Sequence, residues 1–336
     1  MSVRDRLAAL VSPAMRGRAV ATEAGVQGLL AKLPLVRAFW RRRQLPVHLR
    51  RPRHVAIEIT AACNARCTMC PRHLMDRPMR PMNFDLFRKI VDECAAAGVV
   101  EIALNGYGEI FTLRRDAYRE YIDYVRRTAP SVHLIVNTNG FEMDEAAARY
   151  LVEAGVHTVN TDIDAATAET FESIRRHLKL EQVEANLRRL VAIREGMGRA
   201  RPTIRVGLIA MDQNRSEIPQ FIEKWRGRVD YVGVDGLMNR MPGSSWKPGD
   251  HGRPCFDLWS KLMVWASGEA VLCCEDWNAT HVVGDARTHT IQEIWMGAGL
   301  RKARELHLAG AAEGIPMCAG CVYWRHGPFW WFDDWN

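Results

Sequence analysis

Short β-branched or apolar runs alternate with helical patterns at a regular interval from residue 54 onward in this 336-residue chain. Such alternation is typical of βαβ units in a parallel sheet. We expect strands at His54–Thr60, Val100–Asn105, His133–Asn137, His157–Asp164, Thr203–Met211 and Tyr231–Asp235. We expect helices at Asn83–Ala97, Asp116–Thr128, Asp144–Ala154, Ala166–Gly196 and Ser216–Arg226. Because six such units are too few to close an eight-stranded barrel, the sequence predicts an α/β fold with an incomplete (β/α)6 barrel, whose functional loops follow the strand ends.

The pattern changes after Gly236, where prolines and glycines mark a loop-rich boundary. A smaller second unit begins near Arg253, with an apparent hairpin at Lys261–Ala266 and Ala270–Cys274 and a helix near Ile291–Leu308. We therefore expect five segments: a basic helical or extended arm over 1–53, the core over 54–236, a linker over 237–254, a small C-terminal unit over 255–322 and an aromatic tail over 323–336.

Composition excludes several classes of protein. With 48% hydrophobic and 25% charged residues, the chain is neither disordered nor fibrous. The longest early apolar run, Gly25 to Val36, is interrupted by polar and helix-breaking residues and is shorter than the roughly 20 residues that cross a bilayer. We therefore expect no transmembrane segment. The N-terminus shows no convincing secretory cleavage site, so we expect a cytoplasmic protein.

The nine cysteines and the formal charge of +7 point to different features of the chain. In a reducing compartment, cysteines indicate metal binding or catalysis more often than disulfides. The excess positive charge lies early in the sequence, where it could contact nucleic acid or an anionic membrane or form a solvated face. Because no nucleic-acid-binding module accompanies these arginines, we favour the solvated face and expect no nucleic-acid partner.

Three cysteines, Cys63, Cys67 and Cys70, follow the first expected strand with the spacing C-x3-C-x2-C. Three thiolates on one loop can each bind one iron of a 4Fe-4S cluster, which leaves the fourth iron without a protein ligand. Zinc is the alternative, although a structural zinc site normally has four protein ligands. The spacing therefore favours a cluster with one open, reactive iron.

This pattern resembles that of the radical SAM superfamily, and the resemblance extends over roughly residues 54 to 322. It implies an incomplete (β/α)6 TIM-like radical SAM barrel in which S-adenosylmethionine (SAM) chelates the open iron through its amino and carboxylate groups. A reductant such as flavodoxin or ferredoxin would supply the electron that cleaves the sulfonium to a 5′-deoxyadenosyl radical. The resemblance assigns Cys63, Cys67 and Cys70 as both the cluster ligands and the catalytic cysteines.

Residues 105–109, at the end of the second strand, resemble the superfamily's Gly-Gly-Glu-Pro segment. In that comparison Gly108 allows close backbone approach, and the Glu109 carboxylate receives the ammonium of SAM. Tyr107 and Ile110 depart from the family pattern at the positions of a glycine and the proline. The segment therefore matches the family at the carboxylate and departs from it at the positions that make backbone contacts.

The end of the fourth strand supplies further candidates for binding SAM. Asp162 and Asp164 occupy the place of the family's Ser-x-Asp, and Arg175 follows in the segment that often meets the methionine carboxylate. Asp162 departs from the serine but can still accept from ribose hydroxyls. The alternative is that these three residues form only a helix cap and an ion pair. Asn137, with Asn139, is either a cofactor contact or a turn residue.

A second cysteine set resembles the shortened SPASM module called a twitch domain. Cys255 and Cys273, with Gly268 between them, are followed by Cys318 and Cys321. The resemblance implies that these four cysteines hold one auxiliary 4Fe-4S cluster, because no further cysteines follow as in a full SPASM module. A zinc site made of four cysteines remains the alternative.

Two cysteines remain outside these sets. Cys274 adjoins a proposed ligand, so it is the true ligand in place of Cys273, an inert neighbour, or a thiol that donates a hydrogen atom to a substrate radical. We favour the inert neighbour. Cys94 falls within an amphipathic helix and is interpreted as a small buried hydrophobic residue.

The resemblance implies two 4Fe-4S clusters, one bound to SAM and one auxiliary, and an oxidoreductase-type enzyme. The first expectation is oxidation (dehydrogenation), decarboxylation or epimerisation of a small polar biosynthetic intermediate of the sugar or aminocyclitol type. The second is modification of a ribosomally made peptide. A third interpretation, from another class, is a non-catalytic zinc or iron–sulfur protein.

Overall fold

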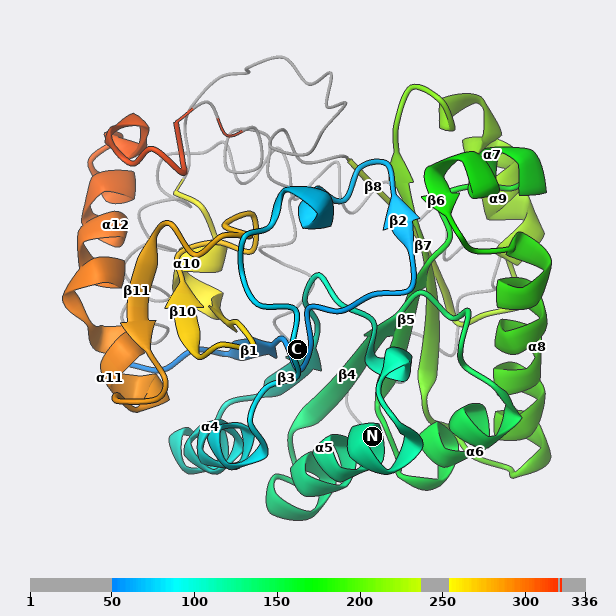
Figure 1. Cartoon of the computed structure of the whole chain (residues 1–336), viewed down its shortest axis with the longest axis horizontal. Helices are drawn as coiled ribbons and strands as arrows, with labels where there is room; N and C mark the ends of the chain where they lie inside the picture. The colour runs from blue at the N-terminus through cyan, green and yellow to red at the C-terminus, as the bar shows by residue number, and fades with distance from the viewer. Residues whose placement is uncertain (1–49, 237–253, 320, 322–336) are drawn as a thin grey trace, which may run out of the picture.

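One mixed sheet organises the chain (Figure 1). The computed structural model describes residues 50–236, 254–319 and 321. The strands of the sheet are β1 (His54–Ile57), β3 (Glu101–Leu104), β4 (His133–Thr138), β5 (Thr158–Asp162), β7 (Thr203–Ala210), β8 (Tyr231–Gly236), β9 (Lys261–Val264), β10 (Glu269–Val271) and β11 (Val282–Asp285). Their order is β11-β10-β9-β1-β3-β4-β5-β7-β8. The pairs from β9 to β8 are parallel, and β10 pairs antiparallel with both of its neighbours.

All six strands expected in the core are present, and they lie side by side in chain order as parallel neighbours. The prediction of an incomplete (β/α)6 arrangement is therefore confirmed for the described residues. Their carboxyl ends share one edge of the sheet, where the functional loops were expected. The loop after β1 crosses this edge to form β2 (Arg66–Cys67), which pairs with β6 (Arg175–Arg176) (Figure 1).

Helices cover the outer face of the sheet (Figure 1). They are α4 (Phe84–Ala97), α5 (Arg115–Thr128), α6 (Glu145–Glu153), α7 (Ala168–Ile174), α8 (Leu180–Gly196) and α9 (Ile218–Trp225). The boundaries of α4 follow from its sequence, because the Asn83 side chain accepts hydrogen bonds from the first-turn amides of Asp85 and Leu86. At its other end Gly98 adopts φ of 69°, the left-handed conformation that a glycine cap provides.

The expected single helix over Ala166–Gly196 is wrong. The chain forms α7, leaves the helix at β6, and resumes as α8 at Leu180. The break includes His177 at φ of 74°, which no α-helix accommodates. Its physical cause is a tertiary contact, since β6 pairs with β2 of the cysteine loop and local helical periodicity does not report such pairing.

The expected helix over Ile291–Leu308 is also interrupted. It consists of α11 (Ile291–Met296) and α12 (Ala298–Leu308), separated by Gly297 with ψ of 163°. The expected hairpin is present as β9 and β10. Strand β9 pairs in parallel with β1, so this hairpin extends the core sheet directly. The proposed boundary between the core and the C-terminal unit therefore remains a prediction. A short helix, α10 (Asp257–Ser260), precedes β9.

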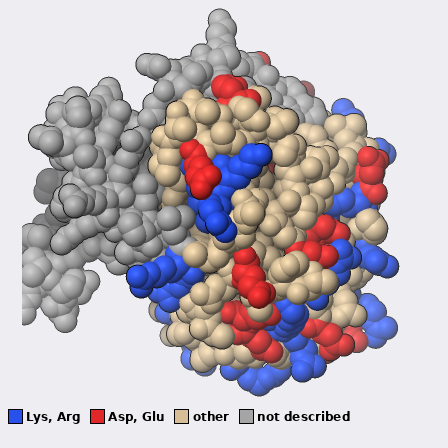
Figure 2. Space-filling model, turned by 90° about the vertical axis from the view of Figure 1, so that its left-hand side faces the viewer, with Lys and Arg blue, Asp and Glu red and all other residues tan. Residues whose placement is uncertain are grey.

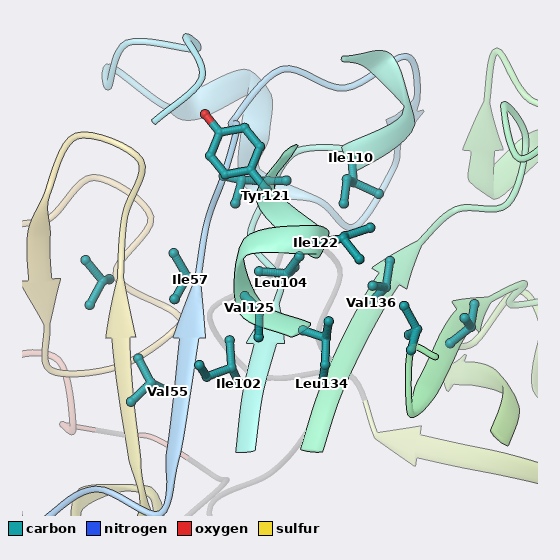
Figure 3. Packing of buried hydrophobic residues seen from close by; sticks show 14 of the residues in the cluster. Val55, Ile57, Ile102, Leu104, Ile110, Tyr121, Ile122, Val125, Leu134 and Val136 are labelled. Carbon is teal, nitrogen blue, oxygen red and sulfur yellow. The ribbon is translucent and has the colours of Figure 1, made fainter. Parts of the chain in front are cut away.

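The main core lies between the sheet and its outer helices (Figure 3). Alternate residues of β1, β3 and β4 form one buried cluster with residues of α5, and each of the following side chains is 0–2% exposed: Val55, Ile57, Ile102, Leu104, Leu134, Val136, Ile122 and Val125. Because strand side chains alternate between faces, Asn137 points to the side opposite Leu134 and Val136. Packing of the core thus turns the polar residue toward the inner face of the sheet.

The described surface mixes charges of both signs. Figure 2 shows acidic and basic side chains interspersed on the face that carries α11 and α12. Within the described ranges, no helix combines the length and apolar character needed to cross a bilayer. The predicted aromatic tail lies outside the described residues, as do all of the basic arm except residues 50–53 and all of the linker except Pro254.

A buried histidine makes stability depend on pH. The Nδ1 atom of His157 accepts a hydrogen bond of 3.1 Å from the Leu134 amide, and burial and the nearby Arg126 lower the pKa of His157 to about 4. Because its folded pKa lies below its unfolded value, the unfolded chain binds more protons between about pH 6.5 and pH 4. We expect the unfolding free energy to fall as pH decreases through this window. Urea unfolding at several pH values should show a smaller decrease for His157→Gln than for the unsubstituted protein, and equal decreases would contradict the assignment.

Candidate iron–sulfur active site

A cavity of about 380 Å³ lies where the strands of the core end. Its walls include all eight site residues that the sequence predicts in the core: Cys63, Cys67, Cys70, Gly108, Glu109, Asn137, Asp162 and Arg175. The residues come from the loop after β1 and from the ends of β3, β4 and β5, with Arg175 supplied by β6. The fold therefore brings together side chains that are more than one hundred positions apart in the sequence.

The cysteine loop is held in place by backbone pairing. Cys67 lies opposite Arg175 in the β2–β6 pair, and the Thr68 amide donates to the Ile174 carbonyl at 2.9 Å. Cys70 then caps the short 3-10 helix η1 (Pro71–Leu74). These contacts fix the path of the loop on either side of its three sulfur atoms.

The three thiols have raised pKa values in this setting. Burial raises the pKa of Cys63 to about 11, partly opposed by a hydrogen bond from the Ala65 amide. Burial also raises the pKa values of Cys67 and Cys70. Thiolates are the form that binds iron, so cluster assembly must displace these protons.

Glu109 is 2% exposed and is held by three donors. Its Oε1 accepts from the Phe111 amide at 3.1 Å and from the Thr138 hydroxyl at 2.7 Å, and its Oε2 accepts from the Asn139 amide at 2.6 Å. Burial raises the pKa of Glu109, while these hydrogen bonds favour the charged form. Since a carboxylate can accept about four hydrogen bonds, it retains capacity for a cationic ligand in the cavity.

Gly108 occupies a position where a side chain does not fit. A Cβ atom there would lie 2.1 Å from the carbonyl oxygen of Thr60. The neighbouring Glu109 amide donates to the Ala62 carbonyl at 2.8 Å, so the loop after β3 packs directly on the cysteine loop. The predicted close backbone approach at Gly108 is thus a contact with the chain itself.

This crowding predicts opposite effects for two glycine substitutions. Gly108→Ala should lower the unfolding free energy by about 1–3 kcal/mol, because the clash involves backbone atoms that must shift. Gly196→Ala is the matched control: nothing lies within 4 Å of its added carbon, and alanine is a better helix residue by up to about 1 kcal/mol. Urea unfolding of both variants measures the difference. A Gly108→Ala protein as stable as the control would contradict the proposed packing.

The aspartates after β5 have different positions. Asp162 lines the cavity, as a ribose contact would require. Asp164 is fully buried and does not line the cavity; it forms an ion pair with Arg175 at 2.6 Å and accepts from the Ile209 amide at 2.7 Å. The ion-pair alternative therefore describes Asp164 and Arg175. Arg175 nevertheless reaches the cavity wall beside Cys67.

Two more asparagines lie at the site: Asn139, which the sequence offered as a cofactor contact or a turn residue, and Asn64, which the sequence analysis missed. The Asn139 side chain donates to the Asn64 side-chain oxygen at 2.7 Å and lies 3.9 Å from the sulfur of Cys63. The side-chain nitrogen of Asn64 is buried without a hydrogen-bond partner. An unpaired donor beside a cysteine cluster fits a bound group that supplies acceptors, as the sulfides of an iron–sulfur cluster do. The position of Asn64 inside the C-x3-C spacing was the only sequence signal for it.

Three cysteines of the second set lie in neighbouring segments of the fold. The Cys321 amide donates to the Cys318 carbonyl at 3.0 Å, forming a turn between them. The His307 side chain accepts from the Cys255 amide at 3.2 Å and lies 3.3 Å from the Cys318 sulfur, so Cys255 lies near this turn. Burial and the charge of Asp257 raise the pKa of Cys255. A hydrogen bond with Cys274, together with burial, raises the pKa of Cys273. Cys273 as the fourth ligand, rather than its neighbour Cys274, stays a prediction.

The spacing of the sulfurs bears on the zinc alternative. Among the described residues, no group of three or more histidine, cysteine, aspartate or glutamate side chains is close enough to hold a single metal ion. A tetrahedral zinc site brings its thiolates to about 2.3 Å from one ion. In a 4Fe-4S cluster each thiolate binds a different iron, so the cysteines need not converge on one point. A 4Fe-4S cluster therefore tolerates wider spacing of its cysteines than a single zinc ion does.

Tyr107 connects the two cysteine sets. Its hydroxyl donates to the Cys274 carbonyl at 2.7 Å, its amide donates to Glu58 at 3.0 Å, and its ring lies 5.5 Å from that of Trp265. Tyr107 also lines the cavity. The departure from the family's glycine thus places a phenol between the cavity and the C-terminal cysteine loop.

The fold and the two cysteine sets define an iron–sulfur enzyme with two centres. Comparison with family models agrees: the Radical SAM superfamily model matches residues 57–223, and the SPASM iron–sulfur cluster-binding domain model matches residues 255–322. The chain belongs to the radical SAM superfamily and carries a C-terminal SPASM domain. Membership implies SAM and 4Fe-4S clusters as cofactors, and it favours a catalytic over a purely structural role.

Curated relatives match part of the chain. A GTP 3′,8-cyclase of Chlorobaculum tepidum is 33% identical over 178 residues, which cover 52% of this chain and 50% of the relative. A tungsten-containing aldehyde ferredoxin oxidoreductase cofactor-modifying protein of Pyrococcus furiosus is 27% identical over 189 residues, covering 55% and 50%. The chain thus spans about half the length of these two relatives.

Solved structures share the fold at low identity. BtrN in complex with AdoMet and 2-DOIA aligns with a TM-score of 0.55 and 17% identity, covering 80% of this chain and 92% of that one. Native anSMEcpe with bound AdoMet aligns with a TM-score of 0.60 and 13% identity, covering 80% of this chain and 88% of that one. Streptococcus suis SuiB bound to precursor peptide SuiA aligns with a TM-score of 0.61 and 11% identity, covering 86% of this chain and 74% of that one. At these identities the likeness shows the fold alone.

Proposed function

We propose that this chain reductively cleaves SAM and abstracts a hydrogen atom from a small polar biosynthetic intermediate of the sugar or aminocyclitol type. Oxidation, decarboxylation or epimerisation would follow. The observation that carries the proposal is the lining of the cavity, where polar side chains extend beyond the three cysteines. They are Asn105, Glu109, Asn137, Thr138, Asn139, Asn160, Asp162, Arg175, Arg205 and Asp235.

The chain's own residues divide the work. Cys63, Cys67 and Cys70 would hold a cluster with one open iron, which supplies the electron for cleavage of the sulfonium. Glu109 would accept from the SAM ammonium, and Asp162 would accept from its ribose. Arg175, whose charge is already paired with Asp164, is better placed to position Cys67 and the methionine carboxylate than to bind substrate.

The far side of the cavity offers a complementary set for the substrate. Arg205 donates to the Asp235 carboxylate at 2.7 Å, and both residues line the cavity from β7 and β8. Asn160, from the end of β5, lies on the same lining. Such a mixture of donors and acceptors suits a molecule rich in hydroxyl or amino groups, because each buried polar group of the ligand needs a partner.

The C-terminal cysteines would hold one auxiliary cluster. Tyr107 joins their loop to the cavity through its hydrogen bond to the Cys274 carbonyl. An auxiliary cluster near the substrate could accept the electron released when a substrate radical becomes a carbonyl. The electron that starts each cycle would come from a separate reductant of the flavodoxin or ferredoxin class, in the cytoplasm.

Transfer of deuterium tests this function. Anaerobic enzyme, SAM and dithionite are incubated with sugars and aminocyclitols deuterated at each carbon, and 5′-deoxyadenosine is analysed by mass spectrometry. We expect deuterium in 5′-deoxyadenosine from one position of a sugar or aminocyclitol. Deuterated GTP and deuterated precursor peptides serve as comparators, because these classes appear in the names of a relative and of a structural neighbour. Label transferred only from a peptide would replace the proposal with that of a peptide maturase.

A further inference from the structure

His307 contacts two of the cysteines assigned to the auxiliary cluster. It lies in the last turn of α12 and is 4% exposed. Its Nδ1 accepts a hydrogen bond of 3.2 Å from the Cys255 amide, and its Nε2 lies 3.3 Å from the sulfur of Cys318. One buried side chain thus bridges two ligand segments that are more than sixty residues apart.

The hydrogen-bond network fixes the tautomer of this histidine. The Cys255 amide can only donate, so Nδ1 must carry a lone pair. A neutral imidazole holds one N–H, which therefore resides on Nε2. That N–H lies within hydrogen-bond distance of the Cys318 sulfur, so His307 is the donor in this contact.

The helix that carries His307 is anchored independently. In the same helix, Arg304 donates to the Leu258 carbonyl at 2.7 Å and to the Trp295 carbonyl at 2.9 Å, and its guanidinium lies 4.2 Å from the centre of the Trp295 ring. Leu258 belongs to α10, which begins two residues after Cys255. The position of the imidazole is therefore set by packing around it, as a preorganised donor requires.

We propose that His307 is a positioning residue that sets the reduction potential of the auxiliary cluster through an N–H···S hydrogen bond to Cys318. The inference rests on the proposed ligand set. Reduction adds one electron and increases the negative charge on the cluster and its thiolates. A donor to a ligand sulfur stabilises that charge, so it raises the potential. This would make the cluster a better acceptor for an electron from a substrate radical.

The test isolates the auxiliary cluster in the full-length chain. Cys63→Ala, Cys67→Ala and Cys70→Ala together remove the SAM-binding ligands, and this parent is compared with versions that also carry His307→Gln or His307→Phe. Glutamine can still accept from Cys255 and donate to Cys318, whereas phenylalanine keeps the ring and can do neither. Midpoint potentials are measured by anaerobic redox titration monitored by electron paramagnetic resonance.

We expect His307→Phe to shift the midpoint potential to a more negative value. We expect His307→Gln to keep the potential close to that of the parent. Equal potentials in the parent and in His307→Phe would overturn the inference. If the His307→Phe protein does not assemble its cluster, pulsed electron paramagnetic resonance of the parent labelled with ¹⁵N-histidine decides. A ¹⁵N coupling to the cluster that His307→Gln removes supports the hydrogen bond. Absence of this coupling in the parent overturns the inference. A parent that binds no iron would overturn the auxiliary site itself.

Discussion

Replacing Cys63, Cys67 and Cys70 with alanine in one chain abolishes formation of 5′-deoxyadenosine from SAM. These cysteines lie on one loop and line the same cavity at the edge of the core sheet. Loss of one cluster should also lower the iron content from about eight to about four atoms per chain. Liquid chromatography of the nucleoside products and iron analysis of anaerobically purified protein measure both effects.

Cys94→Ala is the matched control for this prediction. Cys94 is fully buried within α4 among apolar side chains, and burial strongly raises its pKa. Its replacement should leave the iron content and the cleavage of SAM unchanged. Continued cleavage by the triple variant, or loss of a whole cluster from Cys94→Ala, would contradict the assignment of the ligands.

Glu109→Gln weakens SAM binding by roughly 10- to 150-fold. A hydrogen bond to a charged group contributes about 1.5–3 kcal/mol, and each 1.4 kcal/mol corresponds to a factor of ten. Glutamine preserves the size of the side chain but removes the charge that we propose binds the SAM ammonium. Its amide group would also place a donor among the Phe111, Thr138 and Asn139 donors, each of which needs an acceptor. Isothermal titration with anaerobically reconstituted protein measures the dissociation constant.

Glu217→Gln separates the loss of charge from the loss of a structural acceptor. Glu217 accepts from the Ala166 amide at 2.7 Å and from the Thr167 amide at 3.1 Å, and it does not line the cavity. Glu217→Gln should lower the free energy of unfolding without changing the affinity for SAM. If both variants bind SAM as tightly as the unsubstituted protein, Glu109 is only a cap for the 3-10 helix η2 (Ile110–Thr112).

Local sequence patterns were sufficient to predict the strands of the core. The six expected strands are present because alternating apolar residues bury one face of each, as Leu134 and Val136 do in β4. The predicted ends of α4 also agree, since Asn83 and Gly98 act within a few residues of the helix. The helix predicted through Arg175 failed because β6 pairs with a strand more than one hundred residues earlier in the chain.

The candidate site also contains residues that the sequence predicted and contacts that it did not predict. The spacing of Cys63, Cys67 and Cys70 was visible in one stretch of sequence, and so was the carboxylate of Glu109. The contact of Tyr107 with the Cys274 carbonyl was not, because it joins positions 167 residues apart. The bridge from His307 to two cysteines depends equally on how α12 packs. Sequence motifs therefore indicated which chemistry is present, and tertiary contacts determine how the chain surrounds it.

One measurement addresses the open iron most directly. Enzyme reduced under anaerobic conditions is mixed with SAM labelled with ¹⁵N at its amino group, and electron–nuclear double resonance is recorded on the cluster held by Cys63, Cys67 and Cys70. We predict a ¹⁵N coupling strong enough to require an iron–nitrogen bond, absent from unlabelled samples. A reduced cluster of normal iron content that shows no such coupling with SAM in excess would contradict the central claim.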